Sequence, residues 1–180
     1  MKIILFDLEA TCWQGYQVGR SREIIEIGAV KLDGYGNWID TFETLVRPID
    51  HPHLSTFCTE LTGITTEMVR RAPKFPQAIS AFLDWADPWS EHIVWASWGQ
   101  FDEELMRNNL YAWKMDDEWL SPYIDLKRQY QQLRALPKAK GLISALRKEG
   151  MEFIGRQHRG LDDAKNLARL FVCYIDMWQY

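Results

Sequence analysis

Two acidic side chains stand at the end of the first apolar run of the chain, where they could hold a metal ion. Asp7 and Glu9 follow residues 3–6 (IILF) directly. Alternate residues of a strand point to the same face, about 6.6 Å apart, so the two carboxylates share a face. They repel each other and resist burial, so either this end of the strand is solvated or a divalent cation neutralises it. Oxygen ligands of this kind suit Mg²⁺ or Mn²⁺.

A histidine and an aspartate lie close to the start of the last helical segment. His158 and Asp163 are five positions apart, about 140° on a helix, so they would not share a face if both were helical. Gly160 and the doubled Asp predict a helix start near 161–162, with Asp162 as the N-terminal cap. His158 then lies on the preceding loop and can lean over the first turn, where Asp163 lies. The alternatives are a surface histidine and a carboxylate favoured by the helix dipole.

A further aspartate, Asp102, follows an apolar run over residues 93–96. It shares its helix start with Glu103 and Glu104, and three acids there can simply complement the helix dipole.

The set of acids in chain order is more informative than any one of them. A two-metal phosphodiesterase holds its cations about 3.5–4 Å apart with carboxylates, and a histidine of pKa near 6.5 can deprotonate the attacking water.

The strands and helices that must position these residues alternate along most of the chain. Apolar, β-rich runs predict strands over 3–8, 24–30, 38–46, 93–96 and 121–126. Helical spacing predicts helices over 65–71, 76–86, 101–112, 127–134, 138–149 and from about 161 to 175. A loop-rich stretch is expected between the third strand and Thr65. An antiparallel start followed by this alternation predicts one α/β domain over residues 1–180 with a mixed sheet.

Five blocks of the sequence resemble the DEDDh branch of the DnaQ-like 3′–5′ exonucleases. They are residues 6–11 (FDLEAT), Asp102 with its neighbours, and the His158-x4-Asp163 block, together with residues 22–30 (REIIEIGAV) and 57–65 (FCTELTGIT). The last two, with residues 160–166 (GLDDAKN), are similar to the enhanced-RNAi and 3′-histone-mRNA exonuclease subfamily. The resemblance spans residues 3–170.

This resemblance implies an RNase H-like fold, with a five-stranded mixed sheet flanked by helices. It implies that Asp7, Glu9, Asp102 and Asp163 bind two Mg²⁺ or Mn²⁺ ions and that His158 is the general base. The expected activity is removal of nucleoside 5′-monophosphates from single-stranded 3′ ends, with RNA favoured over DNA. We expect the first ion to be held by the first-strand pair and Asp163, and the second by Asp7 and, through water, Asp102.

Five further residues are candidates for holding the end of the substrate. Ala10 and Thr11 follow the Asp-x-Glu motif, where backbone groups of the family meet the terminal 3′-hydroxyl. Phe57, Leu61 and Phe101 can hold the last base by stacking and wedging, although each can also be a core residue. The subfamily usually has Trp where Phe101 stands, a change that keeps stacking and loses an indole N–H.

Three other functions stay open on the sequence. The first is a DNA-preferring exonuclease of the same fold. The second is a phosphatase of the haloacid-dehalogenase type, because residues 7–11 (DLEAT) approach its Asp-x-Asp-x-Thr motif with Asp7 as nucleophile. The third is an inactive RNA-binding module, which the presence of all five motif residues disfavours.

The composition limits the setting in which the protein works. The chain has 180 residues and a net charge of −4, an average that hides a local excess of positive charge over residues 126–165. This basic stretch runs into His158, where a phosphate backbone would approach. No apolar run is long enough for a membrane helix, and the three cysteines, Cys12, Cys58 and Cys173, show no C-x-x-C pairing. We therefore expect a cytoplasmic protein without a disulfide framework. A monomer is the expected oligomeric state, which the composition does not determine.

Overall fold

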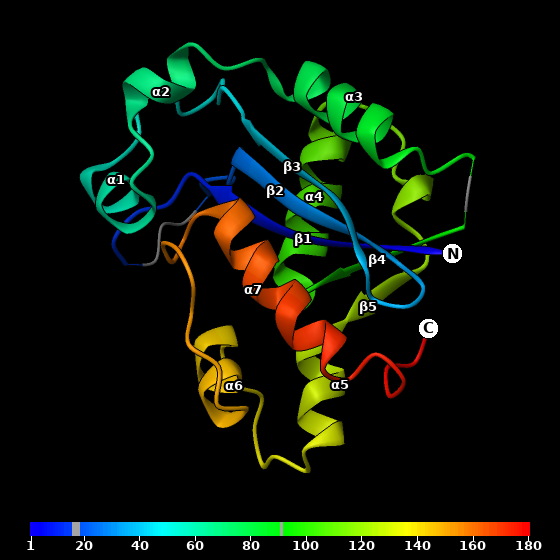
Figure 1. Cartoon of the computed structure of the whole chain (residues 1–180). Helices are drawn as coiled ribbons and strands as arrows, with labels where there is room; N and C mark the ends of the chain where they lie inside the picture. Colours follow the sequence, from blue (N-terminus) through cyan, green and yellow to red (C-terminus); the bar gives the residue numbers. More distant parts are fainter. Residues whose placement is uncertain (16–18, 91) are drawn as a thin grey trace.

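One five-stranded sheet forms the centre of the computed structural model, which describes residues 1–15, 19–90 and 92–180 (Figure 1). Its strands are β1 (Lys2–Ala10), β2 (Ile24–Asp33), β3 (Trp38–Leu45), β4 (Ile93–Ser97) and β5 (Tyr123–Asp125). They lie in the order β3-β2-β1-β4-β5. The first three strands are antiparallel neighbours, while β4 runs parallel to both β1 and β5. The predicted five-stranded mixed sheet is therefore confirmed.

Helices cover both faces of this sheet. They are α1 (Thr56–Thr62), α2 (Thr66–Arg70), α3 (Phe75–Ala86), α4 (Gln100–Ala112), α5 (Leu126–Leu133), α6 (Leu142–Lys148) and α7 (Gly160–Val172), with a 3-10 turn over Glu118–Leu120. Helix α7 lies across β1 and β2 on one face, and α4 lies on the other (Figure 1). Within the described ranges, no helix has the length and apolarity to cross a membrane.

Helix α1 occupies a stretch that was expected to be loop, so this part of the sequence prediction was wrong. The Ser55 hydroxyl accepts a hydrogen bond from the Cys58 N–H at the start of the helix, and Gly63 ends it in the left-handed conformation at φ 73°. Buried Cys58 packs in a small apolar cluster with Ile64 and Val69. Capping and packing together stabilise a helix whose threonines favour it only weakly.

The alternation of side chains along β1 decides which face of the sheet carries chemistry. Ile4 and Phe6 are fully buried in the cluster on the α3 and α4 side. Ile3 and Leu5 are fully buried in the other cluster, which includes α7 residues. Asp7 continues this second series, so it points to the face on which α7 begins. The strand thereby delivers a carboxylate to the amino end of α7.

A pair of glycines allows α7 to approach the sheet closely. A Cβ built on Gly28 of β2 would lie 2.0 Å from both the Gly160 carbonyl carbon and the Leu161 nitrogen. A Cβ on Gly160 would lie 3.0 Å from the Asp7 carbonyl oxygen and from the Gly28 nitrogen. Backbone therefore packs against backbone at the point where α7 starts, and any side chain at Gly28 would push the helix off the sheet.

Replacing Gly28 with alanine should destabilise the protein strongly because the added methyl group overlaps backbone that cannot rotate away. We expect Gly28→Ala to lower the free energy of unfolding by about 3 kcal/mol. Gly141→Ala is the matched control, because a Cβ at Gly141 would meet nothing within 4 Å and should cost less than about 1 kcal/mol. Urea denaturation of the two variants measures the difference, and equal losses would contradict the close-approach argument.

Candidate active site

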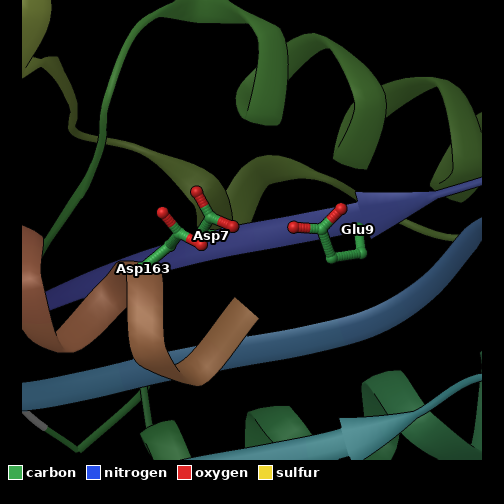
Figure 2. A group of neighbouring side chains, drawn as sticks. All are labelled: Asp7, Glu9 and Asp163. Atoms are coloured by element: carbon green, nitrogen blue, oxygen red, sulfur yellow. The ribbon is translucent and has the colours of Figure 1, made fainter. Parts of the chain in front are cut away.

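Three carboxylates converge where β1 ends and α7 begins. Asp7 and Glu9 come from β1, and Asp163 comes from the first turn of α7. One carboxylate oxygen from each lies within 4.8 Å of the others. The Asp7 and Asp163 carboxylates lie side by side, and that of Glu9 points toward them (Figure 2). Oxygen donors at this separation can share a divalent cation.

A fourth carboxylate, Asp102, approaches the cluster from the start of α4. It is only 6% exposed, and its Oδ1 accepts a hydrogen bond from the Leu8 backbone nitrogen at 3.2 Å. This bond fixes Asp102 beside β1, at the residue that separates Asp7 from Glu9 in the chain. Its neighbours Glu103 and Glu104 are more exposed, and Glu103 pairs with Arg107. Burial and this bond therefore distinguish Asp102 from acids that look alike in sequence.

The loop before α7 is held by a buried ion pair with β2. Glu26 is fully buried and accepts hydrogen bonds from the Arg159 guanidinium, the nearest at 2.7 Å, and from the Gly160 nitrogen, also at 2.7 Å. The backbone nitrogens of Arg159 and His158 donate to the Asp163 carboxylate. His158 itself adopts the left-handed conformation at φ 59°, an uncommon state for a non-glycine residue that this anchoring holds in place.

Two sequence predictions about α7 need correction. The helix begins at Gly160 with Arg159 at its N-cap position, one to two residues earlier than predicted. Asp162 is therefore a first-turn residue and not the cap. Its Oδ2 accepts a hydrogen bond from the Arg156 nitrogen at 2.9 Å, so it fastens the preceding loop to the helix. Even so, His158 lies before the helix and Asp163 in its first turn, as expected.

A cavity of about 320 Å³ joins most of the predicted site residues. All five motif residues line it, together with three of the five candidate substrate contacts: Asp7, Glu9, Asp102, His158 and Asp163, then Ala10, Leu61 and Phe101. The other two candidates lie outside the lining. Phe57 is exposed one helical turn before Leu61 on α1. Thr11 is buried, and both its N–H and its hydroxyl bond the Glu23 backbone.

The cavity also has lining residues that sequence reasoning did not find: Leu8, Cys12, Arg22, Trp98 and Leu142. Trp98 directly follows the carboxyl end of β4. Functional groups often lie at this edge of parallel strands, so the position of Trp98 in the sequence could have marked it as a site residue. Leu142 begins α6 and reaches the cavity only through the tertiary fold. Local sequence alone gives no indication for Leu142, whereas Arg22 begins the 22–30 block of the family resemblance.

Burial and mutual repulsion disturb the protonation of these carboxylates. Burial raises the pKa of Glu9 to about 8, with Asp163 as the next largest cause. Burial likewise raises the pKa of Asp102 to about 7 and of Asp163 to about 6, and it raises the pKa of Asp7 well above its usual range. A cluster that resists ionisation without a cation, and presents oxygens within 4.8 Å of one another, fits a divalent metal ion.

These shifts predict how stability depends on pH without metal. A carboxyl group whose folded pKa is raised stabilises the fold below its ordinary pKa of 3.8 or 4.5, and that stability is lost as pH rises through the folded value. We therefore expect the chelator-treated protein to lose thermal stability between about pH 5 and pH 8. Mg²⁺ or Mn²⁺ should restore most of this loss at pH 8. Melting curves at both pH values test this, and equal restoration at both would count against the cluster as the metal site.

Comparison with characterised proteins shows close relatives of this chain. It is 34% identical to human "3'-5' exoribonuclease 1" over 94% of this chain, and 34% identical to human "ERI1 exoribonuclease 2" over 93% of it. The matched part amounts to 51% and 27% of those two proteins, so the chain spans about half of the first and a quarter of the second.

Solved structures agree with this relationship. The nuclease domain of 3′hExo, described as a DEDDh family member bound to rAMP, superposes with a TM-score of 0.91 at 32% identity. The match covers 97% of this chain and 92% of that domain. A 3′-exonuclease in 3′-end-specific recognition of a histone mRNA stem-loop has the same TM-score at 31% identity, with 97% and 81% covered. These matches confirm the RNase H-like fold.

The family model for exonucleases of the RNase T type matches residues 4–171, nearly the whole chain. This range includes every carboxylate of the cluster and His158. Neither the phosphatase alternative nor any fold other than the exonuclease one has support in these matches. The DEDDh character of the structural neighbours implies divalent metal ions, for which the carboxylate cluster offers the ligands. The chain therefore belongs to the exonuclease family of the RNase T type, and the solved structures similar to it include a member of the DEDDh family.

Proposed function

We propose that residues 1–180 form a single 3′–5′ exonuclease domain that releases nucleoside 5′-monophosphates from single-stranded 3′ ends, with RNA favoured over DNA. The observation that carries this proposal is the convergence of four carboxylates and His158 on one cavity that also has apolar walls. Two human relatives named as exoribonucleases support the preference for RNA.

In this proposal, two divalent cations, Mg²⁺ or Mn²⁺, occupy the carboxylate cluster. Asp7, Glu9 and Asp163 hold the first, because their oxygens lie within 4.8 Å of one another. Asp102 stands apart from that triplet and contributes, with Asp7, to the second. When bound, the ions polarise the attacking water and stabilise negative charge on the leaving 3′ oxygen.

His158 takes the proton from the attacking water. Partial burial lowers its pKa below 6.5, so the imidazole is neutral and able to accept a proton at pH 7. The Arg159–Glu26 ion pair holds the backbone next to His158, which keeps the imidazole at the cavity. Glu26 and Arg159 are thus positioning residues, because neither lines the cavity.

The apolar walls hold the terminal nucleoside. Leu61 from α1 and Phe101 from α4 line the cavity and are proposed to contact the last base. Phe57, one helical turn before Leu61 on α1, is a further proposed contact, although it does not line the cavity. Ala10 is the proposed contact for the terminal 3′-hydroxyl. Thr11 is the weaker candidate for that role, because its N–H already bonds the Glu23 carbonyl oxygen at 2.9 Å.

Degradation of matched oligonucleotides tests the proposed function. Single-stranded RNA and DNA of the same sequence, labelled at the 5′ end, are incubated with Mg²⁺ or with Mn²⁺. We expect a ladder that shortens from the 3′ end, release of 5′-monophosphates, faster loss of RNA, and no cleavage of an RNA blocked by a 3′-phosphate. Equal cleavage of the blocked strand would exclude an exonuclease, and faster loss of DNA would favour the alternative substrate.

We also propose a monomer in the cytoplasm, which sedimentation and microscopy of a tagged protein test.

A further inference from the structure

We propose that Ser97 and Tyr123 are positioning residues that aim the Asp102 carboxylate at the second metal ion, an inference that rests on the proposed function. Ser97 ends β4, and Tyr123 begins β5, the parallel strand beside it. Asp102 lies in the first turn of α4, which follows β4 after a two-residue turn. Neither Ser97 nor Tyr123 lines the catalytic cavity, so both act through Asp102.

The Ser97 hydroxyl lies at the centre of a small polar network. Its Oγ is 2.8 Å from the Tyr123 phenol oxygen and 2.9 Å from the Gly99 carbonyl oxygen. The Tyr123 hydroxyl donates to the same carbonyl oxygen at 2.6 Å. The Ser97 hydroxyl also hydrogen-bonds the Asp102 carboxylate. Because Ser97 is fully buried and Asp102 is only 6% exposed, bulk water does not compete for these contacts.

The number of hydroxyl protons restricts how this network can be arranged. Each hydroxyl has one proton to donate, and an ionised carboxylate that binds metal can only accept. The Ser97 proton must therefore point to Asp102 when that carboxylate binds an ion. The Gly99 carbonyl oxygen is then left to Tyr123, in agreement with their separation of 2.6 Å, the shortest in the network. Tyr123 thus leaves Ser97 free to orient Asp102.

Two donors from different parts of the fold hold the Asp102 carboxylate. The Leu8 nitrogen of β1 donates to its Oδ1 at 3.2 Å, and the Ser97 hydroxyl donates from the end of β4. A carboxylate held in this way keeps its orientation before an ion arrives, which lowers the ordering cost of binding. Removal of such a partner of a metal ligand typically weakens metal binding about 10- to 100-fold.

Calorimetric titration with Mn²⁺, in the absence of RNA, tests the inference directly. We expect two ions per chain in the wild type and, in Ser97→Ala, about tenfold weaker binding of one of them. Tyr123→Phe should weaken the same ion about threefold, because Ser97 must then divide its proton between Asp102 and Gly99. Tyr111→Phe is the matched control and should change the affinity by less than about twofold, because Tyr111 is 85% exposed on α4.

Combined variants separate a positioning role from a general loss of stability. In a Ser97→Ala background, Tyr123→Phe should weaken Mn²⁺ binding by less than about 1.5-fold, because its effect reaches Asp102 only through Ser97. In an Asp102→Asn background, Ser97→Ala should likewise change the affinity by less than about twofold. Independent structural defects would instead multiply, and losses that multiply in both backgrounds would overturn the inference.

Cleavage kinetics give a second readout that a merely structural role would not reproduce. Ser97→Ala should raise the Mn²⁺ concentration for half-maximal cleavage about tenfold. Its KM for RNA should stay within about twofold, because Ser97 does not line the cavity, and its kcat at saturating Mn²⁺ should stay within about threefold. A fall in kcat that excess Mn²⁺ does not restore would count against positioning of a metal ligand.

The outcomes separate this inference from the proposed function. If the wild type binds Mn²⁺ and degrades no RNA, the proposed function fails, and the calorimetric comparison still decides the inference. Equal Mn²⁺ affinities of the wild type and Ser97→Ala overturn it, whatever the wild type does to RNA. If the wild type binds a single ion, weaker binding in Ser97→Ala still supports the inference. If the wild type binds no Mn²⁺, both the inference and the proposed metal site fail.

Discussion

Asp7→Asn should lower kcat by about 10³-fold or more at saturating metal, because it removes the carboxylate proposed to contact both ions. That loss corresponds to about 4 kcal/mol of transition-state stabilisation, and several kcal/mol is what a catalytic metal supplies. The same change should leave the metal-free protein at least as stable as the wild type. Desolvation and the carboxylates of Asp102 and Asp163 raise the pKa of Asp7, so a neutral amide of the same shape removes an unfavourable charge.

For this explanation to hold, Asp7→Asn must lower the cleavage rate without lowering the thermal stability of the metal-free protein. Single-turnover cleavage of labelled RNA gives the rate, and melting in the presence of a chelator gives the stability. Asp84→Asn is the control, because Asp84 is exposed on α3 and should alter neither measurement. A parallel fall in activity and melting temperature would indicate that Asp7 supports the fold and not the metal. Retention of activity within about threefold would remove Asp7 from the site altogether.

His158→Ala should lower kcat by about 10²- to 10⁴-fold at pH 7, the usual contribution of a general base. The wild type should lose activity on acidification, with a midpoint below pH 6.5. Partial burial lowers the pKa of His158, so the imidazole stays neutral, and able to accept a proton, to a lower pH than a free histidine. The variant should lack this limb of the pH profile, because the group that titrates has gone.

Metal binding complicates the pH profile and needs its own control. Protons compete with metal at Glu9 and Asp163, whose pKa values without metal are about 8 and about 6. A limb caused by that competition moves to lower pH as the metal concentration rises, whereas the limb of His158 stays where it is at saturation. His53→Ala serves as the comparison, because His53 is exposed on a loop. If the His158→Ala profile keeps the wild-type limb at saturating metal, another group is the base.

Much of the fold followed from local patterns in the chain. Apolar runs and alternation placed all five strands within a few residues of their observed bounds. Helix α1 was missed because seven residues rich in threonine carry little helix propensity. The fold stabilises this helix through the Ser55 cap and the burial of Cys58.

The sequence by itself determined which residues could do the chemistry. Residue type and order identified Asp7, Glu9, His158 and Asp163 as candidates, and the period of a strand put the first two on one face. Asp102 was added by the resemblance to the exonuclease family. Those inferences depend on covalent spacing, which does not change on folding. They could not say which of three consecutive acids, 102 to 104, reaches the cluster, because each has the same local surroundings.

Only the tertiary structure decided how these residues meet. The contact of Gly28 with Gly160 sets how closely α7 approaches the sheet, and the bond from Leu8 to Asp102 selects one acid of three. The cavity at the carboxylate cluster arises from segments that are far apart in the chain. Backbone approach, burial and shared walls depend on long-range packing, so no local pattern of residues encodes them.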